Sequence, residues 1–199
     1  MKNPEERRPS VCVYAASSRA CHPDYHDAAR RLGLFLAERH YTIIYGGGAA
    51  GLMGALADGA LSRGGRITGV IPKFMNDLEW GHTGLTELQL VEDMHTRKQR
   101  LLAGSDAVVA LPGGSGTLEE LLEAITLKRL GLYLGPIVLV NTRRFFDPLL
   151  QLLASAVEER FMDARHLAMW QVVSQPEQVV EAFETAPPWS SEARNFAAL

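Results

Sequence analysis

The segment 112–120, PGGSGTLEE, has the residue types of an anion-binding loop. It stands between an apolar strand candidate and a helix candidate, so its backbone amides would lie at the positive end of a helix dipole, where phosphate groups bind. No Gly-Lys-Ser/Thr sequence closes the loop, and Lys128 lies far along the helix candidate. The segment therefore predicts a phosphate site and disfavours hydrolysis of nucleoside triphosphates.

Thr117 and Glu120 allow two interpretations. Their spacing is that of a capping box, in which the two side chains would only start a helix. The apolar residues of the same helix candidate form one stripe, made of Leu118, Leu121, Leu122 and Ile125. Three carboxylates would then lie on the opposite side of the helix, those of Glu119, Glu120 and Glu123. These carboxylates either face solvent or lie beside a bound phosphate ester, and the residues alone leave both interpretations open.

A second glycine loop, residues 45–54 (YGGGAAGLMG), follows the second strand candidate. It matches the GxGxxG pattern of dinucleotide sites, but the third strand candidate ends in Ile71-Pro72-Lys73, without the acid that would bind a ribose, which disfavours NAD or NADP. Its glycines, among them Gly47 and Gly48, serve either a tight turn or the close approach of a ligand to the backbone.

The segment 94–100, MHTRKQR, places three cations, Arg97, Lys98 and Arg100, on one helix candidate. They could clamp a phosphate or stabilise developing negative charge. An exposed basic helix face is the alternative, and the residues do not decide between the two.

Composition limits the partners and the enzyme classes. Of the 199 residues, 47% are hydrophobic, and 20 Lys and Arg against 23 Asp and Glu give a formal charge of −3, so neither nucleic acid nor a membrane is an expected partner. No GxSxG or HExxH motif occurs, and no lysine has a recognisable pyridoxal-phosphate setting. Cys12 and Cys21 fit neither a disulfide framework nor a metal cluster, and the charged first ten residues do not resemble a signal peptide. We therefore expect a cytoplasmic protein.

The elements that must position these segments alternate between short apolar runs and longer amphipathic ones. Strands are predicted at 11–16, 42–46, 67–71, 88–92, 107–111, 136–140 and 171–174, and helices at 24–39, 51–63, 94–104, 117–132, 146–160 and 176–184. This alternation predicts a single α/β domain over 1–199, with a core at about 11–184 and tails at 1–9 and 186–199. Its expected architecture is a doubly wound, mostly parallel sheet of six or seven strands with helices on both faces. Ligands of such sheets bind at the carboxyl ends of the strands, where both glycine loops would lie.

The motifs GGGAAGLMG, MHTRK and PGGSGTLEE, in this order and at these separations, resemble those of the LONELY GUY family of cytokinin-activating phosphoribohydrolases. The similarity extends from about Val11 to Val180. It implies a Rossmann-like fold and hydrolysis of the N-glycosidic bond of a nucleoside 5′-monophosphate, such as AMP or a cytokinin riboside 5′-monophosphate. The products would be the free base and ribose 5-phosphate, with no metal and no organic cofactor. A non-catalytic nucleotide-binding or carrier protein, as some superfamily relatives are, remains the alternative.

The resemblance also implies roles for individual residues. Arg97 and Glu120 would be catalytic, with Glu120 acting as base or as nucleophile. The other residues expected at the substrate are Gly113, Gly114, Ser115, Gly116, Thr117, Glu119, Lys98, Glu79, Gly47, Gly48, Ser17, Ser18 and Met94. Residues 15–18, AASS, depart from the cysteine- or glycine-containing loop usual in the family, which leaves the two serines as candidate ligands. A homodimer or higher homo-oligomer is also implied.

Overall fold

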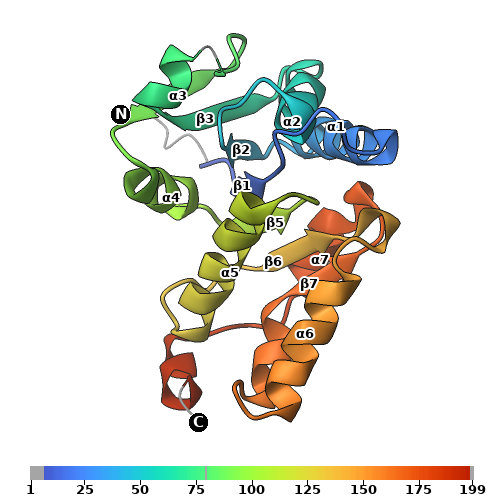
Figure 1. Cartoon of the computed structure of the whole chain (residues 1–199), viewed down its shortest axis with the longest axis vertical. Coiled ribbons are helices and arrows are strands. Elements are labelled where there is room, and N and C mark those ends of the chain that lie inside the picture. The colour runs from blue at the N-terminus through green and yellow to red at the C-terminus, as the bar shows by residue number, and fades with distance from the viewer. Residues whose placement is uncertain (1–6, 79, 198–199) are drawn as a thin grey trace, which may run out of the picture.

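The computed structural model describes residues 7–78 and 80–197 (Figure 1). Within these residues, seven strands form one parallel sheet in the order β4-β3-β2-β1-β5-β6-β7. The strands are β1 (Ser10–Tyr14), β2 (Thr42–Tyr45), β3 (Arg66–Pro72), β4 (Glu87–Val91), β5 (Ala107–Ala110), β6 (Ile137–Val140) and β7 (Gln171–Val173). The strand order reverses between β1 and β5, which is the topological switch point of a doubly wound sheet. The predicted fold class is confirmed.

Helices cover both faces of this sheet. The α-helices are α1 (Pro23–Glu38), α2 (Gly51–Leu61), α3 (Lys73–Asp77), α4 (Met94–Leu102), α5 (Ser115–Arg129), α6 (Asp147–Glu158) and α7 (Val179–Thr185). Alternate strand residues point to opposite faces, so Val11 and Val13 pack with α1, α2 and α7, while Cys12 and Tyr14 pack in a second core with α4, α5 and α6. This two-sided burial explains why the strands read as continuous apolar runs.

Two element boundaries differ from the prediction in a way that matters for the site. Strand β1 ends at Tyr14 instead of residue 16, so Ala15 and Ala16 lie in the following loop. Helix α5 begins at Ser115 instead of residue 117, because its N-cap is Gly114. The five-residue helix α3 was not predicted, since a single turn is too short to show a helical period.

The C-terminal segment from residue 186 was predicted as a tail, but part of it packs on the domain. The indole Nε1 of Trp189 donates a 2.7 Å hydrogen bond to the carbonyl oxygen of Lys128, near the end of α5. The 3-10 helix η4 (Ser191–Phe196) follows, and the ring of Phe196 stacks on the buried His166 of the 3-10 helix η2 (Ala164–Met169) with centroids 5.5 Å apart. The tail prediction missed this because isolated aromatic residues at irregular spacing show no period.

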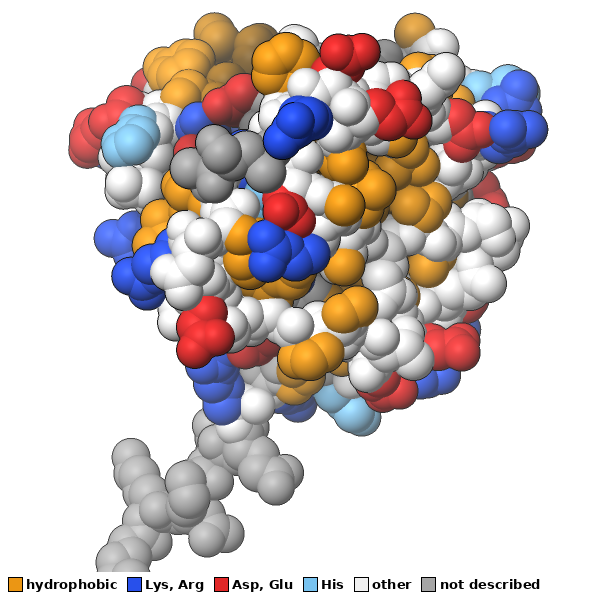
Figure 2. Space-filling view, turned by 90° about the horizontal axis from the view of Figure 1, so that it is seen from below, with side chains coloured by type: hydrophobic (Ala, Val, Ile, Leu, Met, Phe, Trp, Pro, Cys, Tyr) orange, Lys and Arg blue, Asp and Glu red, His pale blue; other side chains and the backbone are white. Residues whose placement is uncertain are grey.

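Several large hydrophobic side chains remain exposed on α5, α6 and the turns that follow them: Leu122, Leu130, Leu132, Leu134, Leu152 and Phe161. Figure 2 shows the molecule of Figure 1 from below, and hydrophobic side chains are gathered on this face among charged ones. In the ranges that the structure describes, no helix has the length and apolar character needed to cross a membrane.

Candidate active site

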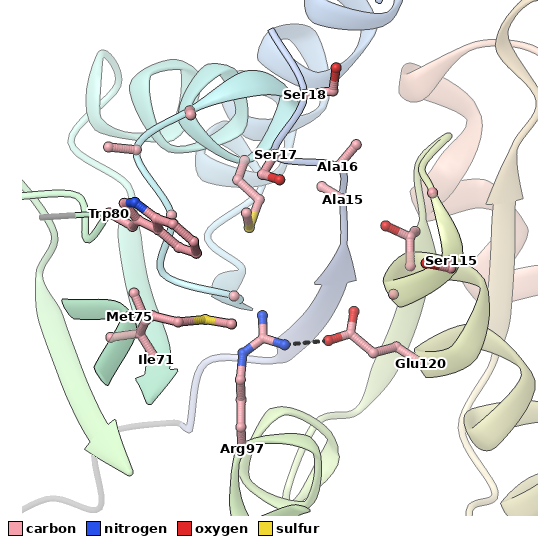
Figure 3. A pocket seen from close by; sticks show the side chains of 18 of the residues that line it. Ala15, Ala16, Ser17, Ser18, Ile71, Met75, Trp80, Arg97, Ser115 and Glu120 are labelled. Atoms are coloured by element: carbon pink, nitrogen blue, oxygen red, sulfur yellow. Dashed lines mark hydrogen bonds and ion pairs between the residues drawn. The ribbon is translucent and has the colours of Figure 1, made fainter. Parts of the chain in front are cut away.

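A cavity of about 690 Å³ opens at the carboxyl ends of the central strands, beside the switch point between β1 and β5 (Figure 3). Its volume lies within the usual range for small-molecule sites. Its walls come from the loop after β1, the glycine loop after β2, the end of β3 with the segment that follows, and the first turns of α4 and α5. The lining residues are Ala15, Ala16, Ser17, Ser18, Arg19, Gly46, Gly48, Ala49, Ala50, Met53, Ile71, Met75, Trp80, Met94, Arg97, Gly114, Ser115, Gly116, Thr117 and Glu120. The cavity thus lies at the carboxyl ends of the strands, where the sequence predicts a ligand site.

Arg97 and Glu120 form a buried ion pair on the wall of this cavity. Nη1 of Arg97 donates to Oε1 of Glu120 over 2.7 Å, and Nε of Arg97 donates to the carbonyl oxygen of Val70 over 3.2 Å. Both side chains are about one-tenth exposed. Gly46 makes room for the guanidinium, since a Cβ at that position would lie 2.3 Å from Nη2 of Arg97. The arrangement holds a carboxylate and a guanidinium in fixed positions at the cavity surface (Figure 3).

The environment of Glu120 acts on its protonation in two opposing ways. Burial raises the pKa of the Glu120 carboxyl, because removing water disfavours the charged form, and the guanidinium of Arg97 offsets part of that rise. The net pKa stays above the ordinary value for glutamate. A carboxylate of this kind is a stronger base than an exposed one, which suits either general-base or nucleophilic chemistry.

The capping-box interpretation of Thr117 and Glu120 is wrong. Helix α5 already starts at Ser115, and its N-cap residue Gly114 offers no side-chain acceptor. Thr117 and Glu120 instead lie on the buried face of the helix with Leu121. The predicted apolar stripe is therefore rotated: Leu122 is 39% exposed, and Glu120 takes a buried position because this part of the helix borders the polar cavity.

The glycines of the 112–120 loop differ in what requires them. At Gly113 a Cβ would lie 2.2 Å from Oγ1 of Thr117, so that glycine is needed for internal packing. At Gly114 and Gly116 an added Cβ would meet no atom within 4 Å, although both residues line the cavity. The amides of the first turn of α5 also have no side-chain cap in the part of the chain that the structure describes. Together these features leave an open surface of N–H donors that a bound anion can approach closely.

The glycine loop after β2 serves both of the purposes that the sequence left open. Gly47 has φ +76°, a turn conformation that favours glycine, and it does not line the cavity. Gly48 does line it. Gly51, with φ +62°, packs against the backbone of Ser17, where a Cβ would approach the carbonyl carbon to 2.4 Å. The loop therefore makes a tight turn and also presents backbone to the cavity.

Lys98 and Glu119, which the resemblance assigned to the substrate, do not line the cavity. Nζ of Lys98 donates to Glu119 over 2.5 Å and lies 3.3 Å from Glu123, so these residues connect α4 to α5. Glu119 is exposed because one residue along a helix turns the side chain by about 100° away from Glu120. Glu79 lies outside the described residues. Ser17, Ser18 and Met94 line the cavity as expected.

Sequence reasoning missed several lining residues, among them Arg19, Met53, Met75 and Trp80. Arg19, Met75 and Trp80 lie outside the three motifs, and Met53 lies inside the second glycine motif but was not singled out there. Their common signal is position, since they stand in or just after connections that leave the carboxyl ends of the strands.

Comparison with known proteins identifies the family. Residues 53–183 match a family model described as "Possible lysine decarboxylase". The chain is 40% identical over 180 residues to the Oryza sativa protein "Probable cytokinin riboside 5'-monophosphate phosphoribohydrolase LOGL2", a match that covers 89% of this chain and 73% of the relative. The chain belongs to the LONELY GUY (LOG) family. The Arabidopsis thaliana LOG1, "Cytokinin riboside 5'-monophosphate phosphoribohydrolase", is 41% identical over 174 residues, covering 86% of this chain and 80% of that protein.

Solved structures outside the close LOG relatives share the fold. The molybdenum cofactor binding protein of Rippkaea orientalis superposes with a TM-score of 0.70 at 22% identity, covering 90% of this chain and 98% of that chain. The molybdenum cofactor carrier protein of Chlamydomonas reinhardtii gives a TM-score of 0.71 at 20% identity, with the same coverage. At these identities the likeness concerns the Rossmann-like fold alone.

Proposed function

We propose that this LOG-family chain hydrolyses the N-glycosidic bond of adenine-type nucleoside 5′-monophosphates, AMP and cytokinin riboside 5′-monophosphates, to free base and ribose 5-phosphate. The main structural support is the buried Arg97–Glu120 pair facing a cavity whose rim is the N-terminal turn of α5. The relatives that are about 40% identical carry the name of this activity.

The phosphate is assigned to the first turn of α5. Residues 114–117 line the cavity, Ser115 adds a hydroxyl group, and the N-terminus of the helix adds partial positive charge there. Ser17 and Ser18, on the loop after β1, offer two further hydroxyls across the switch point. Binding at this end directs the sugar toward Glu120.

Glu120 is assigned to the sugar carbon. As the bond between C1′ and the base nitrogen breaks, its electron pair goes to the base and positive charge develops on the ribose ring. The Glu120 carboxylate stabilises that charge and either takes a proton from the water that attacks C1′ or forms a transient ester that water then hydrolyses. In both routes the hydroxyl of the water ends on C1′ and its proton ends on the departing base nitrogen. Arg97 holds the carboxylate in place and supplies positive charge for the departing base or the ester.

A carrier protein with the same loops is the second candidate. The solved molybdenum cofactor binding and carrier proteins share this fold at 20–22% identity, well below the roughly 40% identity to the relatives named as hydrolases. The buried Arg97–Glu120 pair on the cavity wall supplies the charged groups that bond cleavage needs and that binding alone does not require, so it favours the enzyme.

We also propose that the chain forms a homodimer or a larger homo-oligomer. The exposed leucines of α5 and its following turn, Leu122, Leu130, Leu132 and Leu134, offer apolar surface that a second copy would cover. Light scattering at micromolar concentration tests this, and a monomer would contradict it.

The decisive experiment for the activity is incubation with AMP followed by chromatography for free adenine and ribose 5-phosphate. Purified wild-type protein should release both in equal amounts, and the Glu120→Gln variant prepared in parallel should release neither. Tight AMP binding without any product would support the carrier instead.

A further inference from the structure

One side of the cavity is bounded by a short connection, residues 80–84. Figure 3 shows Trp80 across the cavity from Ser115 and Glu120. The connection lies between α3 and β4 and belongs to no helix or strand. A segment without regular structure of its own opens easily unless other elements hold it. What holds residues 80–84 therefore decides how well this side of the cavity is formed before a ligand arrives.

The backbone of the segment is bonded to the glycine loop after β2. The carbonyl oxygen of Trp80 accepts a 3.0 Å hydrogen bond from the amide of Ala49, and the amide of His82 donates to the carbonyl oxygen of Gly47 over 2.9 Å. Gly81, between these two bonds, forms an antiparallel bridge with the same loop. A two-stranded pairing of this length is marginal in water, so a further contact is needed to keep it closed.

The side chain of His82 supplies that contact. Its Nε2 lies 3.2 Å from Oδ1 of Asp58 on α2, and its Nδ1 accepts a 3.0 Å hydrogen bond from the amide of Gly84. A ring nitrogen that accepts an N–H carries no proton, so the proton of the neutral imidazole is on Nε2, which donates to the carboxylate. The ring thus joins the segment to α2 and also braces the turn that follows.

The two partners differ in exposure. The side chain of His82 is 14% exposed, whereas that of Asp58 is 69% exposed. His82 is therefore packed within the segment, and Asp58 reaches it from the surface of α2. A pair with one exposed partner contributes little to the free energy of unfolding of the whole chain. Its effect is local, on the closure of residues 80–84.

We propose that His82 and Asp58 are positioning residues, which hold the segment 80–84 in the conformation that contacts a bound nucleotide. The proposal rests on the proposed function, because that function places a nucleoside 5′-monophosphate in this cavity. Neither residue lines the cavity, so both act through the segment that carries Trp80. Affinity for the nucleotide then scales with the fraction of molecules in which the segment is closed.

Loss of the pair should change KM and spare kcat. Once a nucleotide is bound, the ligand itself holds the segment, and the Arg97–Glu120 pair across the cavity is unaltered. Asp58→Ala and His82→Ala should therefore raise KM for AMP by about 3- to 10-fold, the range expected for loss of one partly exposed hydrogen bond. In both variants kcat should stay within about twofold of wild type.

Two further variants separate the hydrogen bond from a general effect of substitution. Asp58→Asn keeps an acceptor oxygen for the Nε2–H of His82, so it should raise KM less than Asp58→Ala does. Glu38→Ala is the matched control, because it removes another exposed carboxylate, one that pairs with Arg63 just after α2 over 3.1 Å and does not line the cavity. It should leave KM and kcat unchanged.

Hydrogen exchange provides a measurement that is independent of turnover. Without nucleotide, the amides of His82 and Gly84 should exchange about 3- to 10-fold faster in Asp58→Ala than in wild type, while the amides of β1 keep their protection. Unchanged exchange in residues 80–84 would overturn the proposal. So would a fall in kcat at constant KM, or an Asp58→Asn variant as impaired as Asp58→Ala.

Calorimetry with AMP separates this proposal from the proposed function. If wild type binds AMP but releases no base, the hydrolase assignment fails, while an affinity about 3- to 10-fold lower in Asp58→Ala still supports the role of the pair. Equal affinities in wild type and Asp58→Ala would refute that role whether or not the protein turns over. If wild type binds no AMP, the exchange rates of residues 80–84 decide the matter alone.

Discussion

Nη1 of Arg97 on α4 lies 2.7 Å from Oε1 of Glu120 on α5, which joins two residues 23 positions apart in one buried ion pair. Both side chains have lost most of their water, so each charge depends on the other. The second tie of Arg97, from Nε to the carbonyl of Val70 at 3.2 Å, fixes the guanidinium against β3. The carboxylate is therefore held in place before any ligand arrives, which is the condition for efficient electrostatic stabilisation of a transition state.

Replacing Glu120 by Gln should lower kcat for base release from AMP by at least about 100-fold, because the amide has no charge with which to stabilise the developing positive sugar. AMP should still bind, since the phosphate site at α5 is unaltered. Steady-state kinetics and calorimetry measure the two effects. Glu119→Gln removes the neighbouring exposed carboxylate, and its loss of kcat should stay below about tenfold. Turnover of Glu120→Gln at the wild-type rate would exclude Glu120 from the chemistry.

The acidic limb of the pH–rate profile should reflect the environment of Glu120. Burial holds the pKa of its carboxyl above the ordinary glutamate value, and the group must be ionised to act on the sugar. As pH falls through this raised pKa the carboxylate is protonated, so kcat/KM should decline at a higher pH than an exposed glutamate would produce. A profile measured from pH 4 to 8 checks the position of the limb. Glu119→Gln should shift it only slightly toward lower pH, since the charge of Glu119 contributes less to the raised pKa of Glu120 than burial does. A limb at or below the ordinary glutamate value would contradict the assignment.

Gly116→Ala should affect stability and activity in opposite directions. An added Cβ at this position meets no protein atom, and alanine is a better helix former than glycine, so the free energy of unfolding should stay equal or rise by up to about 1 kcal/mol. The same Cβ projects where the phosphate is assigned, so kcat/KM for AMP should fall by about tenfold or more. Urea unfolding and kinetics on one preparation test both effects. Full activity in this variant would mean that the phosphate lies elsewhere.

The 5′-phosphate should be required for turnover. Loss of two charge-assisted hydrogen bonds, each contributing about 1.5 to 3 kcal/mol, should make kcat/KM for adenosine roughly 10²- to 10⁴-fold lower than for AMP. ATP should also be a poor substrate, because the loop has no lysine extension for the outer phosphates. Base release is compared at equal subsaturating concentrations of the three compounds. Equal rates for adenosine and AMP would mean that the 112–120 loop serves only as a turn and helix start.

The sequence by itself determined the parts of this protein that depend on local pattern. Apolar runs alternating with amphipathic segments specify a doubly wound sheet, because strands buried on both faces must be apolar throughout. Glycines placed between a strand and a helix specify loops at the strand ends, which is how residues 45–54 and 112–120 marked the location of the cavity. These features need only near neighbours in the chain, so they can be read without the fold.

The tertiary structure decided everything that depends on contacts between distant segments. Thr117 and Glu120 line the cavity and do not cap α5, because the helix starts at Ser115 and because Arg97 on another helix lies within hydrogen-bonding distance of Glu120. The orientation of α5 about its axis decided which of the adjacent residues Glu119 and Glu120 lines the cavity, because successive side chains on a helix point about 100° apart. Trp80 reached the opposite wall because segment 80–82 pairs with the glycine loop after β2, more than thirty residues earlier in the chain. No local pattern encodes such pairings, since their free energy comes from surfaces that meet only in the folded chain.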